Sequence, residues 1–527
     1  MQSDPIIPEF AMYSGDLDKK EIEELNLRLA QEKRSSKNRF LIFTDLLLDF
    51  IGSGEWKNHS DAFIAMCAKA AFLRGKYGYN QILAKETTNI TCNGYAAAAY
   101  CRQSLDPRWI NNLRNYVNQA WQSSDYIAFA ELSGQLAAVL IDLGYADHSK
   151  EVAEESIERV TKATTHNPEI RKKIQLALLR PRIILAYIAS TSELRDEAMI
   201  RLDAAEDASE ILDHQLALVD VEYFRARVMH DFREIDRALD ILTSAIRKYE
   251  RMDYLLGVAR ARNLRGVIYL GKGLLQEARD QFEELLIIQQ QLNYQVGLAS
   301  TLINVGEIDR ALGQLEQMET YNQRALEISQ EAEFVKGIAL SNSNLGDVEL
   351  RRGNIEEALK RYMKSIKIVE DSGMKELLRL FCFLAGDAYY ATQKYDKALE
   401  MYKRGRKAAV ETGDDLIAFH ADVSELVLSW TSDNPEDKDV LNRVRDLMDS
   451  KDEFLESTSS EPMIELRRRI HQDDSLESSH CVLFDIEKNY ECRADRDSLK
   501  KECFGNLFWK GVLCSYFVTF LNRLYPD

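Results

Sequence analysis

The segment "SNSNLGDVELRRGNIEEALKRYMKSI" (341–366) carries small and aromatic residues at separations that recur along the chain. Gly346 is followed twelve residues later by Ala358, and Tyr362 and Ser365 lie four and seven residues beyond that alanine. At intervals of 40 residues, the position of Gly346 is occupied by Ala186, Ala226, Gly266, Gly306, Gly346 and Gly386. This spacing indicates six copies of one structural unit in strict phase.

Three further positions of the unit keep the same phase. They are occupied by Ala198, Ala238, Ala278, Met318, Ala358 and Ala398; by Leu202, Leu242, Phe282, Asn322, Tyr362 and Tyr402; and by Ala205, Ala245, Leu285, Ala325, Ser365 and Gly405. Two antiparallel helices approach closely where both carry small side chains, and the aromatic or leucine side chain fills the gap to the next pair. Each hairpin leaves an apolar face that only a neighbouring hairpin can cover. The sequence therefore predicts an all-α fold, a right-handed α-solenoid of stacked helix-turn-helix repeats.

The proline distribution supports helices through this region. No proline lies between Pro181 and Pro435, and the interval is rich in Ala, Leu, Glu, Arg and Gln, which favour helices. Runs of Val, Ile and Thr with alternating polarity are absent, so no strand is expected. The apolar residues also fail to keep a seven-residue register, which argues against a coiled coil.

Two segments carry a recognisable signature: "NLGDVELRRGNIEEALKRYMKSI" (344–366) and "LAGDAYYATQKYDKALEMYKRG" (384–405). Their Leu-Gly, Tyr, Ala and Phe/Tyr positions resemble the tetratricopeptide repeat, whose usual unit is about 34 residues. The longer unit resembles the repeats of Pins-type spindle-orientation adaptors, in which Asn often stands two residues before the Gly. Asn304 and Asn344 match that pattern, whereas Leu264 and Leu384 do not, and the G-protein-binding motifs of those adaptors are absent. The resemblance covers about residues 180–412 and implies that both asparagines grip a peptide backbone.

Composition and phase divide the chain into five expected segments. They are a flexible N-terminus (1–19), divergent helical hairpins (20–135), the solenoid (136–432), a polar linker (433–465) and a cysteine-containing tail (466–527). The solenoid contains the six in-phase repeats at about 179–412, one degenerate repeat before them and capping helices after them. The N-terminus lacks the charged and apolar regions of a signal or transit peptide, so a cytoplasmic protein is expected.

The C-terminal tail raises two alternatives. Cys481, Cys492, Cys503 and Cys514 are spaced by eleven residues. On one helix that spacing is about 16 Å, too far for four thiolates to share one zinc ion, so ordinary cysteines are favoured over a metal site. The apolar segment 504–527 is expected to pack on the last repeat, with a membrane anchor or a palmitoylated cysteine as the alternative.

Charge and motifs limit the classes of function. The net charge of −18 argues against binding nucleic acid. The basic segment 171–182 is interpreted as the solvated side of a helix rather than a phosphate-binding face. The chain contains no nucleotide-binding, zinc-protease or serine-hydrolase motif, and its eight histidines are scattered. We therefore expect neither an enzyme nor a bound cofactor or metal.

The remaining candidate site is the concave surface that the first helices of the repeats line. The residues expected there, besides Arg180 and Tyr187, are Tyr223, Arg227, Arg260, Asn263, Asn304, Glu307, Arg310, Asn344, Asp347, Asp387 and Tyr390. The earlier positions are basic and aromatic, and the later ones are acidic. Such a groove can hold a peptide or helix through paired hydrogen bonds. The sequence thus predicts a scaffold or adaptor for a protein or peptide partner. The alternatives are a peptide-sensing regulator that switches a partner, and an enzyme with a repeat arm.

Overall fold

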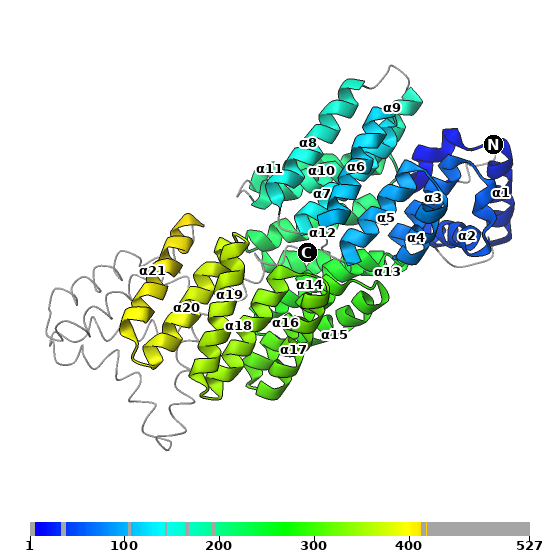
Figure 1. Ribbon diagram of the computed structural model, residues 1–527. Helices are drawn as coiled ribbons and strands as arrows, with labels where there is room; N and C mark the ends of the chain where they lie inside the picture. The colour runs from blue at the N-terminus through cyan, green and yellow to red at the C-terminus, as the bar shows by residue number, and fades with distance from the viewer. Residues whose placement is uncertain are drawn as a thin grey trace. The chain divides into compact units, whose positions relative to one another are not determined.

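The computed structural model describes residues 6–412 apart from five short segments (33–37, 104–106, 143–144, 164–167 and 192–194), and it also describes Ala418. These described residues form helices and no strand (Figure 1). They fall into two compact units, which divide between Thr301 and Leu302. The all-α solenoid expected from the sequence is confirmed.

The first unit contains most of the helices. In chain order they are η1 (Pro8–Asp16), α1 (Lys19–Glu32), α2 (Arg39–Ser53), η2 (Glu55–Asn58), α3 (Asp61–Leu73), α4 (Tyr77–Glu86), α5 (Ile90–Gln103), α6 (Pro107–Gln122), α7 (Tyr126–Asp142), α8 (Ala146–Ala163), α9 (Pro168–Ala177), α10 (Leu179–Thr191), α11 (Arg195–Ile211), α12 (Gln215–Asp231), α13 (Ile235–Arg251), α14 (Leu255–Gly271) and α15 (Leu275–Gln291). The division between the units falls within α16 (Gln295–Leu312).

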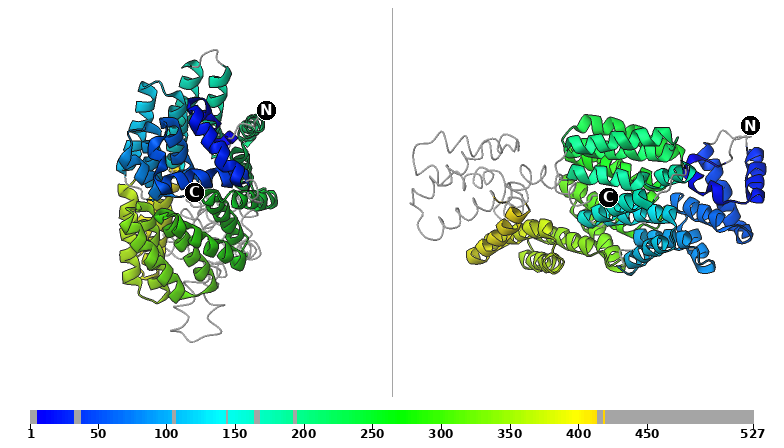
Figure 2. Two further views of the ribbon diagram at one scale, coloured as in Figure 1. Left: turned by 90° about the vertical axis from the view of Figure 1, so that its right-hand side faces the viewer. Right: turned by 90° about the horizontal axis from the view of Figure 1, so that it is seen from above.

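After the shared helix α16, the second unit continues with five helices of equal length. They are α17 (Leu315–Glu331), α18 (Val335–Arg351), α19 (Ile355–Asp371), α20 (Lys375–Ala391) and α21 (Tyr395–Glu411). Among them, α18 packs on α19 and α20 packs on α21. In the first unit α7 pairs with α8, α10 with α11, α12 with α13 and α14 with α15. Figure 2 shows these hairpins as neighbouring helices joined by short turns.

Glycine occupies the points where the two helices of a hairpin come closest. A Cβ atom added at Gly346 would lie 2.8 Å from the ring of Tyr362, and one at Gly266 would lie 2.8 Å from the ring of Phe282. Because these distances are shorter than van der Waals contact, a larger residue would have to displace the ring. The sequence analysis assigned the ring to the gap before the next pair, and the structure adds this contact within the hairpin.

The covering residue varies in bulk with the small residue beneath it. Alanine stands with leucine and glycine with an aromatic residue or asparagine: Ala186 with Leu202, Ala226 with Leu242, Gly266 with Phe282, Gly306 with Asn322, Gly346 with Tyr362 and Gly386 with Tyr402. These covering residues are all buried. Five of the six pairs thus fill a similar volume by dividing it differently between their two helices, and the pair of Gly306 and Asn322 is smaller.

A tight turn joins the two helices of each repeat. In the turn between α18 and α19, Gly353 has φ +83°, a left-handed conformation that favours glycine. The N–H of Gly353 donates to the carbonyl of Leu350 at 2.9 Å, and the N–H of Asn354 donates to that of Glu349 at 2.8 Å. This pair of bonds is a Schellman motif, which satisfies the last carbonyls of the helix. The turn therefore ends α18 with its last carbonyls hydrogen-bonded and leads directly into α19.

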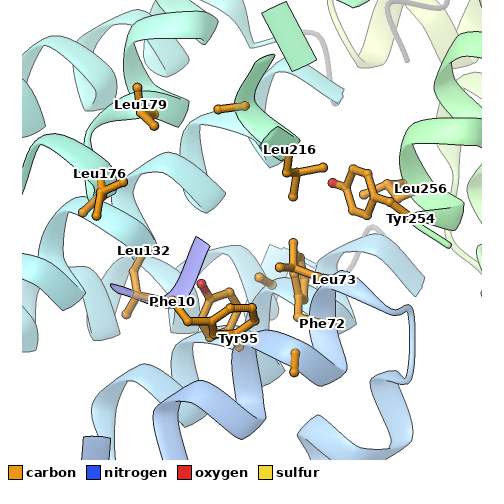
Figure 3. Close-up of a cluster of buried hydrophobic side chains, with 14 of the residues drawn as sticks. Phe10, Phe72, Leu73, Tyr95, Leu132, Leu176, Leu179, Leu216, Tyr254 and Leu256 are labelled. Carbon is orange, nitrogen blue, oxygen red and sulfur yellow. The ribbon is translucent and has the colours of Figure 1, made fainter. Parts of the chain in front are cut away.

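The first helices of the chain share an apolar interior with the repeats of the first unit. Ile7, Phe10 and Met12 of the η1 region are buried there, although the sequence analysis placed residues 1–19 in a flexible N-terminus. Figure 3 shows Phe10 and Tyr95 in this interior, together with leucines of α7, α9, α10 and α12. The periodicity of apolar residues that marks an α-helix cannot reveal this burial, because η1 is a short 3-10 helix. The other segment boundaries inferred from the sequence stay predictions.

Several expectations concern residues that the structure does not describe. The polar linker 433–465, the tail 466–527 with its four cysteines and the apolar segment 504–527 all lie outside the described residues. Within the described part of the chain, no helix is both long enough and apolar enough to cross a bilayer. Cys67, Cys92, Cys101 and Cys382 are buried and form no disulfide.

Candidate functional site

A pocket in the first unit is lined by residues of α7, α10, α12 and α14. Its empty volume is about 440 Å³, including the part that is open to solvent. Arg180, Asp220 and Arg260 line it at intervals of 40 residues, so successive repeats place the same position around one opening. The other lining residues are Ala138, Ile141, Ile183, Ile184, Tyr187, Tyr223, Phe224 and Arg227.

Asp220 is the acidic residue of this pocket. Its Oδ1 accepts a hydrogen bond of 2.7 Å from the hydroxyl of Tyr249, and its Oδ2 lies 3.5 Å from the guanidinium of Arg180. Burial and the charge of Asp220 raise the pKa of Tyr249 well above its usual value, so this hydroxyl stays a donor. Burial and Arg260 oppose the charge on Arg180, but Tyr254 and Asp220 outweigh them, and the pKa of Arg180 is raised.

Arg227 lies among aromatic side chains. Its guanidinium carbon is 4.4 Å from the ring centre of Tyr187, within cation–π range, and its Nη1 donates to the hydroxyl of Tyr223 at 3.4 Å. Both Arg227 and Tyr223 are buried, and Arg260 is half-buried. The structure thus brings five of the predicted residues to one pocket: Arg180, Tyr187, Tyr223, Arg227 and Arg260. Asn263, the remaining prediction in this unit, is half-buried on α14 and is not among the lining residues.

The second unit holds the other predicted residues on α16, α18 and α20. Glu307 accepts a hydrogen bond of 2.6 Å from Nε of Arg310 and one of 2.8 Å from the amide of Asn344. The same amide lies 3.0 Å from Oδ1 of Asn322. Burial raises the pKa of Glu307, although the charge of Arg310 opposes this shift. Three predicted residues, Glu307, Arg310 and Asn344, thus form one network with Asn322, which the repeat pattern assigned to packing. This network joins α16, α17 and α18.

Asn304 differs from its counterpart Asn344. It lies two residues before Gly306, as Asn344 lies two before Gly346, and it is 1% exposed. Its Oδ1 and Nδ2 are both buried, and within the described residues neither has a hydrogen-bond partner. A buried polar group without a partner costs about 1–3 kcal/mol, so native proteins contain few of them. An unpaired amide at this repeated position therefore calls for an explanation.

Asp347 and Asp387 each accept a hydrogen bond from a tyrosine of the same hairpin. The hydroxyl of Tyr362 lies 2.8 Å from Asp347, and that of Tyr402 lies 2.6 Å from Asp387. Burial raises the pKa of Asp387 to about 7, against the effect of the Tyr402 hydrogen bond. These aspartates consequently have a structural partner in addition to the binding role predicted for them. Tyr390, the last prediction, is half-buried.

Sequence reasoning missed the partners of these acidic residues. The sequence does contain a signal in the residue that follows the repeat glycine. That residue is Asp347 where Tyr362 stands fifteen residues after it, but it is Val267 where Phe282 stands fifteen residues after it. Asp220 was missed too, although it shares the 40-residue register of Arg180 and Arg260. Whether any of the predicted residues contacts a ligand stays a prediction.

No metal site is evident in the part of the chain that the structure describes. There, no group of three or more His, Cys, Asp or Glu side chains is placed to hold an ion. The buried cysteines are poor ligands as they stand, because burial raises the pKa of Cys67 well above its usual value and that of Cys382 to about 12. The expectation of no cofactor and no catalytic activity stays a prediction.

Helical hairpins stacked at a fixed period define the class of this molecule as a helical repeat protein. A family model described as tetratricopeptide repeat matches residues 257–331, 297–371 and 337–411. Residues 257–411 of the chain therefore consist of tetratricopeptide repeats. The likeness to Pins-type adaptors is not confirmed by any comparison, and no curated protein matches the sequence.

Solved structures are similar to this chain over most of its described part. The apo form of RapI shares 15% identity at a TM-score of 0.50 and matches 69% of this chain and 98% of its own. A Rap protein in complex with competence and sporulation factor shares 20% identity at a TM-score of 0.45, with 69% and 98% covered. Aspartyl phosphate phosphatase F from Bacillus subtilis shares 15% identity at a TM-score of 0.43, with 69% and 94% covered. At such identities the likeness to RapI indicates the fold alone.

Proposed function

We propose that this protein is a non-catalytic binding protein whose repeats hold an extended peptide or a helix of a partner protein. The observation that carries the proposal is the buried amide of Asn304, whose oxygen and nitrogen both lack a partner among the described residues. An asparagine amide can accept from a peptide N–H and donate to a peptide C=O at the same time. A peptide backbone would therefore satisfy both atoms in one contact.

The surroundings of Asn304 support a polar ligand rather than an apolar one. Glu307, Arg310 and Asn344 lie on the same helix or on the next first helix and form a hydrogen-bonded network. Polar groups on rigid helices fix the register of a bound peptide. A peptide bound in a shifted register would leave these polar groups without hydrogen-bond partners and would therefore bind more weakly. This arrangement favours specific recognition of one peptide segment over non-specific binding.

A second function, peptide sensing, has support from the same residue. Asn304 is 1% exposed, so a ligand reaches it only when neighbouring side chains move. A peptide that binds the opened arrangement better than the closed one shifts the population of the repeats. Such a shift would let peptide binding switch the affinity for a second partner. The adaptor and the sensor differ in whether binding changes the solenoid.

Substitution of Asn304 separates a binding role from a structural one. The wild-type protein and Asn304→Ala are each panned against a random peptide library, and the affinities of the recovered peptides are measured. We expect Asn304→Ala to weaken binding about tenfold or more, as two hydrogen bonds are lost, while thermal stability is unchanged or raised, as an unpaired buried amide is removed. Asn342→Ala on α18 is the control, because that amide bonds back to the carbonyl of Ile338 in its own helix.

The opposite pattern would overturn the proposal. If Asn304→Ala binds every recovered peptide as tightly as the wild type, the amide has no part in binding. If no peptide is recovered by the wild type, the peptide-binding function itself fails. Hydrogen exchange with and without a recovered peptide then distinguishes the two functions, because a sensor changes protection beyond the contacted helices and an adaptor does not.

A further inference from the structure

The segment 6–17 lies across the inner side of the first unit. Its 3-10 helix η1 packs on α3, α9 and α12, and the hydroxyl of Tyr13 donates to Glu131 of α7. Because α7 and α12 are the first helices of their hairpins, η1 covers the side on which stacked repeats present their binding surface. Figure 3 shows Phe10 of this segment in one interior with leucines of α7 and α12. The segment therefore occupies the place of a ligand.

The conformation of η1 depends on these contacts. 3-10 helices longer than three or four residues are uncommon, whereas η1 has nine residues. No described side chain caps its N-terminus. Residues three apart in a 3-10 helix point in the same direction, so Phe10 and Tyr13 face one side. The surrounding helices thus keep the segment in its conformation, as a groove does with a bound peptide.

Lys69 of α3 is the polar centre beneath the segment. Its ammonium lies 5.6 Å from the ring centre of Phe10 and 5.9 Å from that of Tyr13, both within cation–π range. The same ammonium is 3.5 Å from Sδ of Met12, and it pairs with the carboxylate of Glu131. Lys69 and Glu131 are both buried. Removal of the segment would therefore expose a charged pair that a ligand with aromatic rings and a hydroxyl can cover again.

Glu9 makes the second polar contact of the segment, at the start of α12. It is 3% exposed, and its Oε1 accepts a hydrogen bond of 3.4 Å from the backbone N–H of Leu216. The first N–H groups of a helix have no partner within it, and a carboxylate is favoured there. His214 accepts from the N–H of Ala217 at 3.1 Å, so Glu9 adds a bond that this local cap does not make. The segment thus contacts the repeats through an acid, two aromatic rings and a thioether at fixed positions.

We propose that residues 6–17 are an intramolecular ligand of the first unit, and that the surface beneath them is a peptide-binding site in its own right. This η1 site consists of Lys69, Glu131 and the N-terminus of α12. The partner that it takes is a peptide segment of the same chemistry: an acidic residue followed at once by an aromatic one, with a tyrosine four positions after the acid. Asn304 belongs to the second unit, so the inference does not rest on the function proposed for that residue.

The covalent link makes the segment a strong competitor for its own site. A tethered ligand has an effective concentration on the order of millimolar. A free peptide at about 10 µM therefore leaves the wild-type site filled by residues 6–17. Phe10→Ala removes a buried ring and should weaken the internal contact about a hundredfold or more. A free peptide that keeps its phenylalanine should then bind to this variant.

The test measures the fluorescence anisotropy of a labelled synthetic peptide with the sequence of residues 6–17. At about 10 µM peptide we expect binding to the Phe10→Ala protein and none to the wild type. Peptides that carry Glu9→Ala, Phe10→Ala or Tyr13→Phe should bind this variant at least about tenfold more weakly. Ser14→Ala is the matched control in protein and peptide, because the Ser14 hydroxyl bonds to a carbonyl within η1. It should behave as the unchanged sequence does in both.

Failure of the peptide to bind would overturn the inference. A folded Phe10→Ala protein that binds no peptide would show that the segment leaves no site behind. If circular dichroism shows that this variant is unfolded, Tyr13→Phe takes its place, because it keeps the ring and should bind peptide at about 100 µM. A folded Tyr13→Phe protein that rejects the peptide would show that residues 6–17 are a permanent part of the core.

Two measurements locate the bound peptide. Hydrogen exchange should show raised protection in α3, α7 and α12 when the peptide binds. Asn304→Ala added to Phe10→Ala should leave the affinity for this peptide unchanged. A loss of affinity in that double variant would assign the peptide to the second unit and overturn the η1 site, while unchanged affinity supports it whatever the role of Asn304.

Discussion

Two buried carboxylates of the first unit lie beside cations, whereas two aspartates of the second unit accept hydrogen bonds from tyrosine hydroxyls. In the first unit the carboxylate of Glu131 pairs with the ammonium of Lys69, and that of Asp220 faces Arg180. The hydroxyls of Tyr13 and Tyr95 also donate to Glu131. Each of these carboxylates is therefore bonded to a cation and to at least one hydroxyl.

The second unit places two aspartates beside neutral donors. Asp347 and Asp387 accept hydrogen bonds from Tyr362 and Tyr402, and the pKa of Asp387 rises to about 7. Glu307, which pairs with Arg310, lies between these cases. The comparison shows that stacked helical hairpins can hold a buried carboxylate in either arrangement. The two differ in what a substitution does: loss of one partner of an ion pair leaves a buried, unpaired charge that destabilises the fold, while an aspartate beside a hydroxyl can become neutral by binding a proton.

Loss of Glu131 should produce the largest effect. The change Glu131→Gln keeps an acceptor for the two tyrosines but leaves the buried ammonium of Lys69 without its carboxylate. Breaking a buried ion pair in this way typically costs about 3–5 kcal/mol. We expect a loss of that size in the free energy of unfolding of the first unit, measured by denaturant titration with hydrogen exchange in α3, α5 and α7 as the local readout.

The exposed pair of Glu158 and Lys162 on α8 supplies the control. Because both side chains are solvated, Glu158→Gln should leave the unfolding curve unchanged within error. The double change Lys69→Met with Glu131→Gln should restore part of the lost stability, since no buried charge is left unpaired. Equal effects of Glu131→Gln and Glu158→Gln on the free energy of unfolding would show that the buried ion pair stabilises the fold no more than the exposed one.

Close packing under the ring gives the second prediction. In Gly266→Ala the new methyl would lie 2.8 Å from the ring of Phe282, so overpacking of about 1–3 kcal/mol opposes a gain in helix propensity of about 1 kcal/mol. We expect a net loss of stability on denaturant titration. Adding Phe282→Leu should recover most of it, because that pair reproduces Ala226 with Leu242 elsewhere in this chain.

The same double change should behave differently in the second unit. Gly346→Ala with Tyr362→Leu relieves the overlap but removes the hydroxyl that donates to Asp347. A buried acceptor without its donor costs about 1–3 kcal/mol, so recovery should be smaller there by that amount. Gly78→Ala on α4, where a new methyl meets nothing within 4 Å, should be neutral or slightly stabilising. Full recovery in both units would mean that the tyrosine hydroxyl adds no stability.

These pairs also show what the sequence could and could not predict. The 40-residue period predicted the hairpins and the close contacts, because small and large residues alternate at fixed separations. It did not predict the network around Glu131, since Tyr13 and Glu131 are 118 residues apart and share no repeat position. The period also placed the predicted groove residues on the first helices, but a period cannot indicate which of these residues hydrogen-bond to one another. Asn304 and Asn344 look alike in sequence and differ only in their surroundings.

The pH dependence of the second unit should give the smallest effect. The pKa of Asp387 is about 7 in the folded protein and about 3.8 as an ordinary carboxyl, so the folded state binds the proton more tightly. This contribution to stability is fully present below the ordinary value and is lost as pH rises through the folded pKa. Asn at this position accepts the hydrogen bond from Tyr402 and does not titrate.

We therefore expect the melting temperature of Asp387→Asn, relative to that of the wild type, to rise between pH 5 and pH 8 and then to level off. Hydrogen exchange of α20 and α21 at each pH assigns the change to the second unit. Tyr402→Phe tests the cause, because the hydroxyl lowers the pKa of Asp387 and its removal should move the inflection to higher pH. A difference that stays constant across this range would mean that Asp387 is ionised throughout, and the contrast between the two units would then lie in geometry rather than in protonation.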